Sequence, residues 1–162
     1  MFHRFYPDQM VRSTYDIDFE KLYRDGYRGL IFDIDNTLVP HGAPADDRAR
    51  ALFARLRAIG FECCLLSNNR EHRVKMFNKD VKVHFISNAH KPSRTNYEKA
   101  MELMGTNKKN TIFIGDQLFT DIYGAKRTGI ANILVSPIHP KEEIQIVLKR
   151  KLENVILYFY KK

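Results

Sequence analysis

Four short polar clusters, each close behind an apolar run, contain the residues of this sequence that are best suited to chemistry. They are Asp33–Thr37 after GLIF, Ser67–Asn69 after ECCLL, Lys91-Pro92 after HFISNA, and Gly115-Asp116 after TIFI, with Asp121 five residues beyond Asp116. Carboxylates, a hydroxyl and a lysine gathered in one place can hold a divalent cation and a phosphate group. The clusters therefore predict a single cation-and-phosphate site.

The carboxylates of Asp33, Asp35 and Asp116 together favour a metal ion as the cation of the site. On an extended strand end, residues two apart lie on the same face. Two carboxylates that close repel each other, so a site that keeps both needs a cation, a shared proton or separate roles. Asp116 adds a third carboxylate from another strand end. Oxygen-only ligation with open positions suits Mg²⁺, which we expect as the cofactor.

Apolar runs alternate with helical periodicity along the chain. Strands are expected at 29–33, 61–66, 81–87, 111–115 and 132–136, and helices after an Asp46 or Asp47 cap to Gly60, over about 70–78, from Ser93 to Gly105, and over 121–128. Single helices between strands predict a three-layer, Rossmann-like α/β fold with a mostly parallel sheet and helices on both faces. Ligands bind such sheets at the carboxyl ends of the strands, where all four clusters lie. The short intervals leave no room for a large cap domain, so we expect an open site.

Length and composition set wider limits. With 162 residues, 44% of them hydrophobic and 28% charged, the chain suits one domain over residues 1–162. We expect a cytoplasmic protein, because no apolar run is long enough to span a bilayer and the first residues lack the apolar core of a signal peptide. The net charge of +8 favours an anionic partner, which leaves phosphorylated metabolites, nucleic acid and anionic membranes open.

The four motifs together resemble those of the haloacid dehalogenase superfamily phosphatases, over a catalytic core of about residues 29–137. The resemblance implies that Asp33 is the nucleophile that attacks phosphorus and forms an aspartyl-phosphate. It implies that Asp35 is the general acid–base, and that Asp33, the Asp35 backbone carbonyl and Asp116 hold Mg²⁺. An aspartate at position 35 favours hydrolysis of a phosphomonoester over dehalogenation or ion pumping.

The resemblance also assigns the other polar residues of the motifs. Ser67, Asn68 and Lys91 would bind the phosphoryl oxygens, and Lys91 would also neutralise charge as the nucleophile approaches. Thr37 would support the first motif. For Asp121 two interpretations stay open: it orients Lys91 or the metal ligands, or it caps its helix.

A closer resemblance rests on FDIDNTLVP, LLSNN, AHKP and GDQLFTDIYGAKRTG, which are together similar to the YqeG-like subfamily IIIA phosphatases. That family is related to the mitochondrial-type phosphatidylglycerophosphatases, which makes a lipid phosphate such as phosphatidylglycerophosphate the leading substrate. A soluble sugar phosphate or nucleotide is the alternative. A nucleic-acid-associated protein without turnover is a third, but the basic residues are dispersed and no nucleic-acid partner is expected.

Both ends of the chain are rich in aromatic residues. Phe2, Phe5 and Tyr6 stand near the start, and Tyr158–Lys162 combine aromatic and basic side chains at the end. These segments either pack against the domain or make peripheral contact with an anionic membrane, at its inner face. The sequence determines neither the substrate, the pathway nor the oligomeric state.

Overall fold

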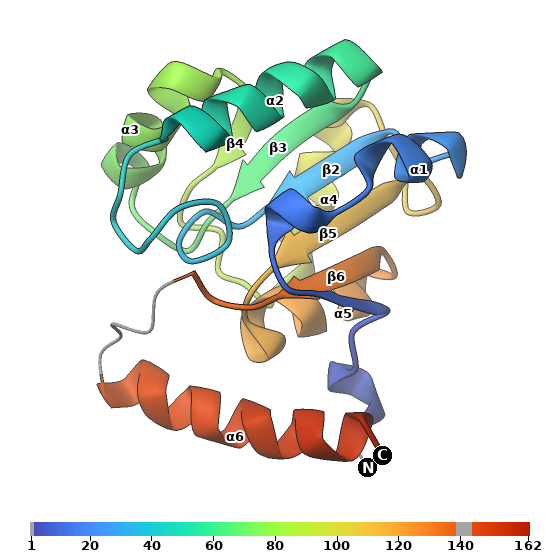
Figure 1. The fold of residues 1–162 in the computed structure, drawn as a ribbon, viewed down its shortest axis with the longest axis vertical. Coiled ribbons are helices and arrows are strands. Elements are labelled where there is room, and N and C mark those ends of the chain that lie inside the picture. The colour runs from blue at the N-terminus through green and yellow to red at the C-terminus, as the bar shows by residue number, and fades with distance from the viewer. Residues whose placement is uncertain (1, 139–143) are drawn as a thin grey trace.

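The computed structural model describes residues 2–138 and 144–162, without the side chains of 144–147. In these residues six strands form one sheet in the order β1-β6-β5-β2-β3-β4, and every neighbouring pair is parallel (Figure 1). The strands are β1 (Gln9–Val11), β2 (Gly29–Phe32), β3 (Glu62–Leu66), β4 (His84–Ile86), β5 (Thr111–Gly115) and β6 (Ala131–Val135). The helices are α1 (Phe19–Arg24), α2 (Asp47–Ile59), α3 (Glu71–Val81), α4 (Arg94–Met104), α5 (Tyr123–Thr128) and α6 (Ile144–Tyr160), with short 3₁₀ turns at His3–Phe5 and Thr14–Asp16 and a π-helical turn, η3, at Leu118–Ile122.

The predicted three-layer α/β fold is confirmed. Helices α1, α2 and α3 cover one face of the sheet, and α4 and α5 cover the other (Figure 1). Strand β2 is buried along its whole length, as its unbroken apolar sequence predicts for a central parallel strand. Its alternate side chains enter different cores, Leu30 and Phe32 on the α2 side and Ile31 on the α4 side.

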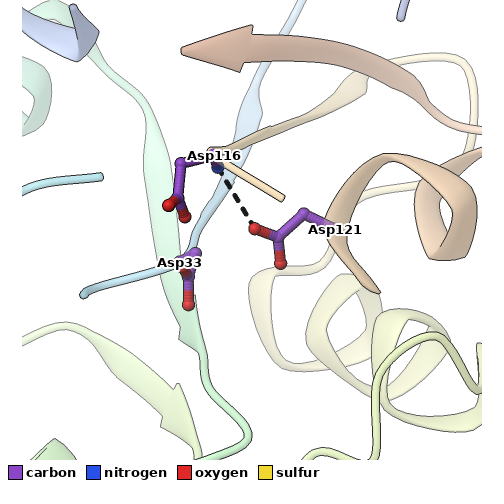
Figure 2. Close-up of side chains that lie close together, drawn as sticks. All are labelled: Asp33, Asp116 and Asp121. Carbon is purple, nitrogen blue, oxygen red and sulfur yellow. Dashed lines mark hydrogen bonds between the residues drawn. The ribbon is translucent and has the colours of Figure 1, made fainter. Parts of the chain in front are cut away.

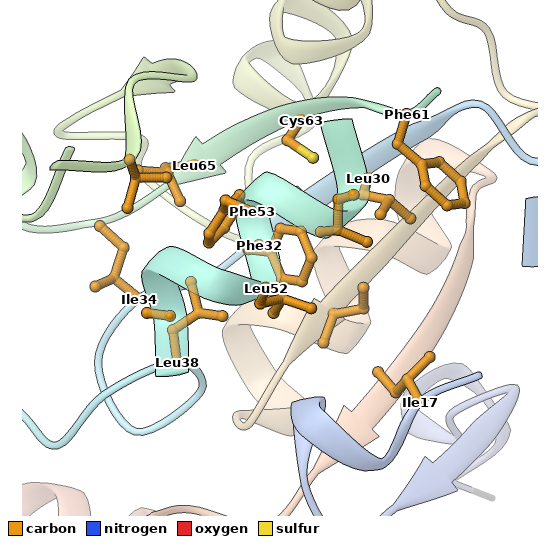
Figure 3. Packing of buried hydrophobic residues seen from close by; sticks show 14 of the residues in the cluster. Ile17, Leu30, Phe32, Ile34, Leu38, Leu52, Phe53, Phe61, Cys63 and Leu65 are labelled. Carbon is orange, nitrogen blue, oxygen red and sulfur yellow. The ribbon is translucent and has the colours of Figure 1, made fainter. Parts of the chain in front are cut away.

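The larger core lies between α2 and the sheet. Figure 3 shows Leu52 and Phe53 of α2 against Leu30 and Phe32 of β2. The rings of Phe32 and Phe53 meet edge to face with centroids 5.2 Å apart, a favourable arrangement for two aromatic rings. This packing fixes the direction of β2 and therefore the position of the residues that follow it.

Local sequence signals determine where the helices begin and end. The Asp46 carboxylate accepts a hydrogen bond of 2.8 Å from the Ala49 amide and so caps α2, and Gly60 ends that helix with a positive φ of 120°. Ser93 stands at the cap position of α4, but its side chain makes no capping hydrogen bond. Gly105 ends α4 in the left-handed conformation.

Some predicted boundaries were wrong. Helix α3 continues to Val81, because Phe77 and Val81 extend its buried face, and β4 is consequently limited to His84–Ile86 instead of 81–87. The predicted helix over 121–128 begins earlier, with the π-helical turn η3 before α5. Strand β1 was not predicted, since three residues are too few to display a strand period.

Helix α6 lies along the side of the sheet formed by β1 and β6, with its first residues toward the carboxyl edge of the strands (Figure 1). Ile156 is buried against Leu118 and Ile122. The ring centroids of Tyr6 and Tyr160 are 5.0 Å apart. Packing against the domain therefore holds for Phe2, Phe5 and Tyr6, which lie against the cluster around Ile156. Tyr158 and Phe159 are exposed, and membrane contact stays a prediction.

The outer side of α6 is different in character. Leu148, Leu152, Val155, Tyr158 and Phe159 are all exposed there, each with about half or more of its surface accessible. None of the helices in the described part of the chain is both long and apolar enough to cross a bilayer.

Candidate active site

Three buried carboxylates, from Asp33, Asp116 and Asp121, meet at the carboxyl ends of β2 and β5 (Figure 2). One oxygen of each lies within 4.8 Å of the others. The sheet register explains the meeting, because Phe32 of β2 is paired with Ile114 of β5 and the two chains leave the sheet side by side. Asp121 reaches the other two from the π-helical turn η3.

Lys91 neutralises two of these three carboxylates. Its Nζ lies 3.0 Å from Asp33 Oδ1 and 2.7 Å from Asp121 Oδ1, and its side chain is only 3% exposed. Burial alone would lower the pKa of this ammonium group, but the carboxylates of Asp121 and Asp33 outweigh that effect and raise the pKa. The lysine is therefore a permanent cation within the carboxylate cluster.

Burial alone lowers the pKa of a lysine, but it raises the pKa of a carboxylic acid. It raises the pKa of Asp33 to about 7, with a further contribution from the Asp116 carboxylate and opposition from Lys91. Burial and repulsion from neighbouring carboxylates also raise the pKa values of Asp116 and Asp121. Lys91 and Arg150 of α6, which contacts the Asp116 carboxylate, provide two cations for three carboxylates, so the cluster can still attract a divalent cation.

Thr37 indicates which oxygens would face a metal ion. Its Oγ1 lies 3.5 Å from Asp33 Oδ2 and 3.1 Å from Asp116 Oδ1, so these two oxygens are directed at a common region. Asp121 is engaged otherwise, since its Oδ1 accepts from Lys91 and its Oδ2 accepts from the backbone amides of Asp116 and Gln117. Oxygen donors at such spacing fit Mg²⁺, which Asp33 and Asp116 would hold.

Gly115 makes the position of Asp121 possible. A Cβ atom on residue 115 would lie 2.5 Å from Asp121 Oδ2, closer than any real Cβ contact. Helix α4 also holds the turn that carries Asp121. The buried Tyr97 hydroxyl of α4 donates to the backbone carbonyl of Thr120 at 2.8 Å and to that of Asp121 at 3.1 Å. The acid is thus fixed against the backbone of the neighbouring strand end.

Asp35 has a different environment from Asp33, so the expectation that they share one strand face was wrong. Strand β2 ends at Phe32, and Asn36 already has a positive φ of 62°. The Asp35 carboxylate accepts hydrogen bonds from the Gly42 amide at 2.7 Å, from Arg73 Nη2 at 2.8 Å, and from the Asn69 side chain. It is a separate acid next to the cluster, surrounded by donors.

Arg73 is a site residue that the motifs did not identify. It lies on α3, is 9% exposed, and holds Asp35 through both Nε and Nη2. Its third nitrogen, Nη1, is buried without a hydrogen-bond partner in the described part of the chain. The signal available in the sequence was an arginine four residues before Phe77, on the apolar face of the helix.

The second-motif residues hold the loops around the site. Ser67 is buried at the end of β3, and its hydroxyl accepts a hydrogen bond of 3.0 Å from the Asn69 amide. The Asn68 side chain pairs with the backbone of Lys91, accepting from its amide at 2.7 Å and donating to its carbonyl at 3.3 Å. The side chain of Asn68 therefore supports the Lys91 loop, and its predicted role in binding the phosphate stays a prediction.

Helix α6 contributes two further residues that the motifs did not indicate. The Arg150 guanidinium contacts both the carboxylate and the backbone carbonyl of Asp116. Glu153 is buried and accepts hydrogen bonds from the amides of Leu118 at 3.1 Å and Phe119 at 3.4 Å. It thereby caps the turn that carries Asp121. No spacing rule connects α6 to the motifs, so only its docking reveals these contacts.

Comparison with known proteins agrees with this geometry. Residues 88–145 match the Hydrolase_like family, which is described as HAD-hydrolase-like. Over 154 residues the chain is 36% identical to the probable phosphatase YqeG of Bacillus subtilis, covering 94% of this chain and 90% of that protein. The chain belongs to the haloacid dehalogenase (HAD) phosphatase family. The resemblance predicted from the four motifs is confirmed.

A more distant relative and a solved structure of similar fold extend the comparison. The chain is 28% identical over 162 residues to the chloroplastic/mitochondrial phosphatidylglycerophosphate phosphatase 1 of Arabidopsis thaliana, covering 93% of this chain and 47% of that protein. The fold is similar to that of a HAD phosphatase from Thermococcus onnurineus, with a TM-score of 0.55 and 14% identity over 72% of this chain and 90% of that one. The protein is a HAD-type phosphatase, as predicted.

Proposed function

We propose that this HAD phosphatase hydrolyses a phosphomonoester in two steps, with Asp33 as the nucleophile and Mg²⁺ as the cofactor. The observation that supports the proposal best is the placement of Asp33 between Lys91 and Asp116 at a buried strand end. Asp33 forms a bond to phosphorus while the bond to the leaving oxygen breaks. A water molecule then attacks the aspartyl-phosphate, which releases inorganic phosphate and restores the carboxylate.

Charge neutralisation is the main requirement of this reaction, because a carboxylate approaches a phosphate anion. Lys91 supplies one fixed positive charge next to the attacking group. When bound by Asp33 and Asp116, Mg²⁺ would neutralise further charge and keep Asp33 ionised. Asp121 keeps Lys91 in place without competing for the attack, because both of its oxygens already accept hydrogen bonds.

Asp35 is the proposed proton donor to the leaving oxygen and proton acceptor from water. Its present partners are all donors, an arrangement that suits an ionised carboxylate. We propose that substrate binding replaces the Gly42 or Asn69 contact, so that the acid can carry a proton. Arg73 would keep the carboxyl group oriented during this exchange.

For the substrate we propose a lipid phosphate such as phosphatidylglycerophosphate. Support comes from the relative named as a phosphatidylglycerophosphate phosphatase, from the net charge of +8, and from the apolar residues exposed on α6. A cytoplasmic protein with peripheral contact to the inner face of an anionic membrane would meet this substrate. We further propose that residues 1–162 act as one catalytic domain, with its core at 29–137.

The test is turnover by Asp33→Asn with and without Mg²⁺, on a chromogenic phosphate and on phosphatidylglycerophosphate. We expect a loss on the order of 10³-fold or more, with an unchanged circular dichroism spectrum. Asp25→Asn is the control, since Asp25 pairs with Lys21 on the surface and should leave turnover unchanged. Substantial turnover by Asp33→Asn would remove Asp33 from the role of nucleophile.

A further inference from the structure

A cavity of about 730 Å³ lies between α6 and the side of the sheet formed by β1 and β6. Its apolar wall consists of Met10 and Val11 of β1, Leu134 and Val135 of β6, Pro137, and Leu157 of α6. The cavity is much larger than a phosphate group and falls in the size range of pockets that bind whole small molecules. Nothing in the proposed chemistry at Asp33 uses it.

The cavity reaches the active site. Asp116, one of the three clustered carboxylates, forms part of its wall together with Arg150, which contacts that carboxylate. Lys161 also lines the cavity and stands eleven residues after Arg150. At the rise of an α-helix that separation is about 16 Å, so the cavity runs from the carboxylate cluster along the inner side of α6.

Cationic side chains slightly outnumber acidic ones along the cavity, since Asp116 and Glu153 line it beside three cations. Arg150, Lys151 and Lys161 all contribute to its wall. Glu153 also lines it, but its carboxylate already accepts hydrogen bonds from the amides that begin η3. Arg150 is paired with Asp116 and Glu153, so Lys151 and Lys161 are the cations beside the apolar wall that complement a molecule joining hydrocarbon to a negatively charged head group.

We propose that this cavity binds the acyl-glycerol portion of a glycerophospholipid phosphate monoester, with the phosphate beside Arg150 and the carboxylate cluster. The direction of the bound molecule rests on the proposed function, because the phosphate has to reach Asp33. The acyl chains lie along Met10, Leu134 and Leu157, removed from water. The head group and the chains are thus recognised by different elements, the strand ends and α6.

The experiment uses two methionines of nearly equal exposure. Met10 is 39% exposed and lines the cavity, whereas Met76 is 42% exposed on α3 and does not. Met10→Glu and Met76→Glu are each made in the Asp33→Asn protein, so that binding is measured without turnover. Calorimetry then compares dihexanoyl phosphatidic acid, kept below its critical micelle concentration, with glycerol 3-phosphate, which has the same head group and no chains.

We expect the lipid to bind at least tenfold more tightly than glycerol 3-phosphate to Asp33→Asn and to its Met76→Glu form. Met10→Glu should remove most of that preference, because a carboxylate in the apolar wall repels the anion and opposes the chains. Asn154→Trp is a second variant for the case in which Met10→Glu does not fold. Asn154 is exposed and lines the cavity, so an indole there would fill the space without disturbing a core.

Equal affinity for the two ligands, or equal loss in Met10→Glu and Met76→Glu, would overturn the proposal. So would a dimer of the native chain, detected by sedimentation, that Met10→Glu dissociates, because the cavity would then be an interface between copies. Turnover of a chromogenic phosphate by the native chain tests the proposed function independently. Absence of turnover with a retained lipid preference would refute the proposed chemistry and leave the cavity as a lipid site.

Discussion

Two regions of the molecule place charged side chains in different ways. The first is the carboxyl edge, where β2 and β5 end, and the second is the flank, which is the side of the sheet at β1 and β6 that α6 covers. At the edge, Lys91 lies between Asp33 and Asp121 on loops that continue directly from the sheet and its turns. On the flank, Arg150 reaches Asp116 from a separate helix that is held by Glu153 and by the small cluster around Ile156. The sheet itself thus fixes the reactive charges, while the docking of one helix adds charges around them.

The largest expected effect is that of Lys91→Met, at the edge. Removing the ammonium group that pairs with both Asp33 and Asp121 should cost about 3–5 kcal/mol of unfolding free energy, because it takes the lysine's compensation away from two buried carboxylates. Turnover should fall by about 10²–10³-fold. Denaturant titration at pH 8 measures the first effect and steady-state kinetics the second. If Lys91→Met unfolds at the same denaturant concentration as Arg150→Met, the distinction between edge and flank is wrong.

A second prediction concerns how stability depends on pH, and it involves only the carboxyl edge. The folded protein raises the pKa of Asp33 to about 7, so between about pH 4 and 7 the folded state binds more protons than the unfolded state. The corresponding stability is present at low pH and is lost as the pH rises through 7. We therefore expect the melting temperature of the metal-free protein to fall from pH 5 to pH 8, and the fall to be smaller in Asp33→Asn. An identical pH dependence in both proteins would contradict the assignment to Asp33.

The smallest effect, of opposite sign, is expected on the flank. Arg150 contacts the Asp116 carboxylate that would bind Mg²⁺, so the two cations compete for it. Arg150→Gln should bind Mg²⁺ several-fold more tightly in calorimetry, with little change in melting temperature when Mg²⁺ is saturating. Weaker Mg²⁺ binding would instead mean that Arg150 supports the metal site, and the flank would then belong functionally to the edge.

The residues that sequence analysis placed correctly are those whose position follows from the sheet. Asp33 and Asp116 come directly after strands that are neighbours in a parallel sheet, so their meeting follows once the strands are recognised. Arg73 and Arg150 could not be placed in this way, because their contacts depend on how a helix rotates and docks. Strand β1, which builds one wall of the cavity, carries too few residues for any periodicity to indicate it.

The packing of Asp121 against the last residue of β5 restricts which amino acids position 115 can hold. Gly115 has an ordinary backbone conformation, and its constraint is one of space, since the Asp121 carboxylate occupies the volume that a Cβ atom would need. Gly26 is the reverse case, with open space around it and a positive φ of 105°. A side chain at Gly26 would have room but would strain the backbone, and the strain would be least for asparagine, which tolerates left-handed backbone. Position 115 admits no side chain while Asp121 keeps its place, so a substitution of Gly115 requires that Asp121 change or move.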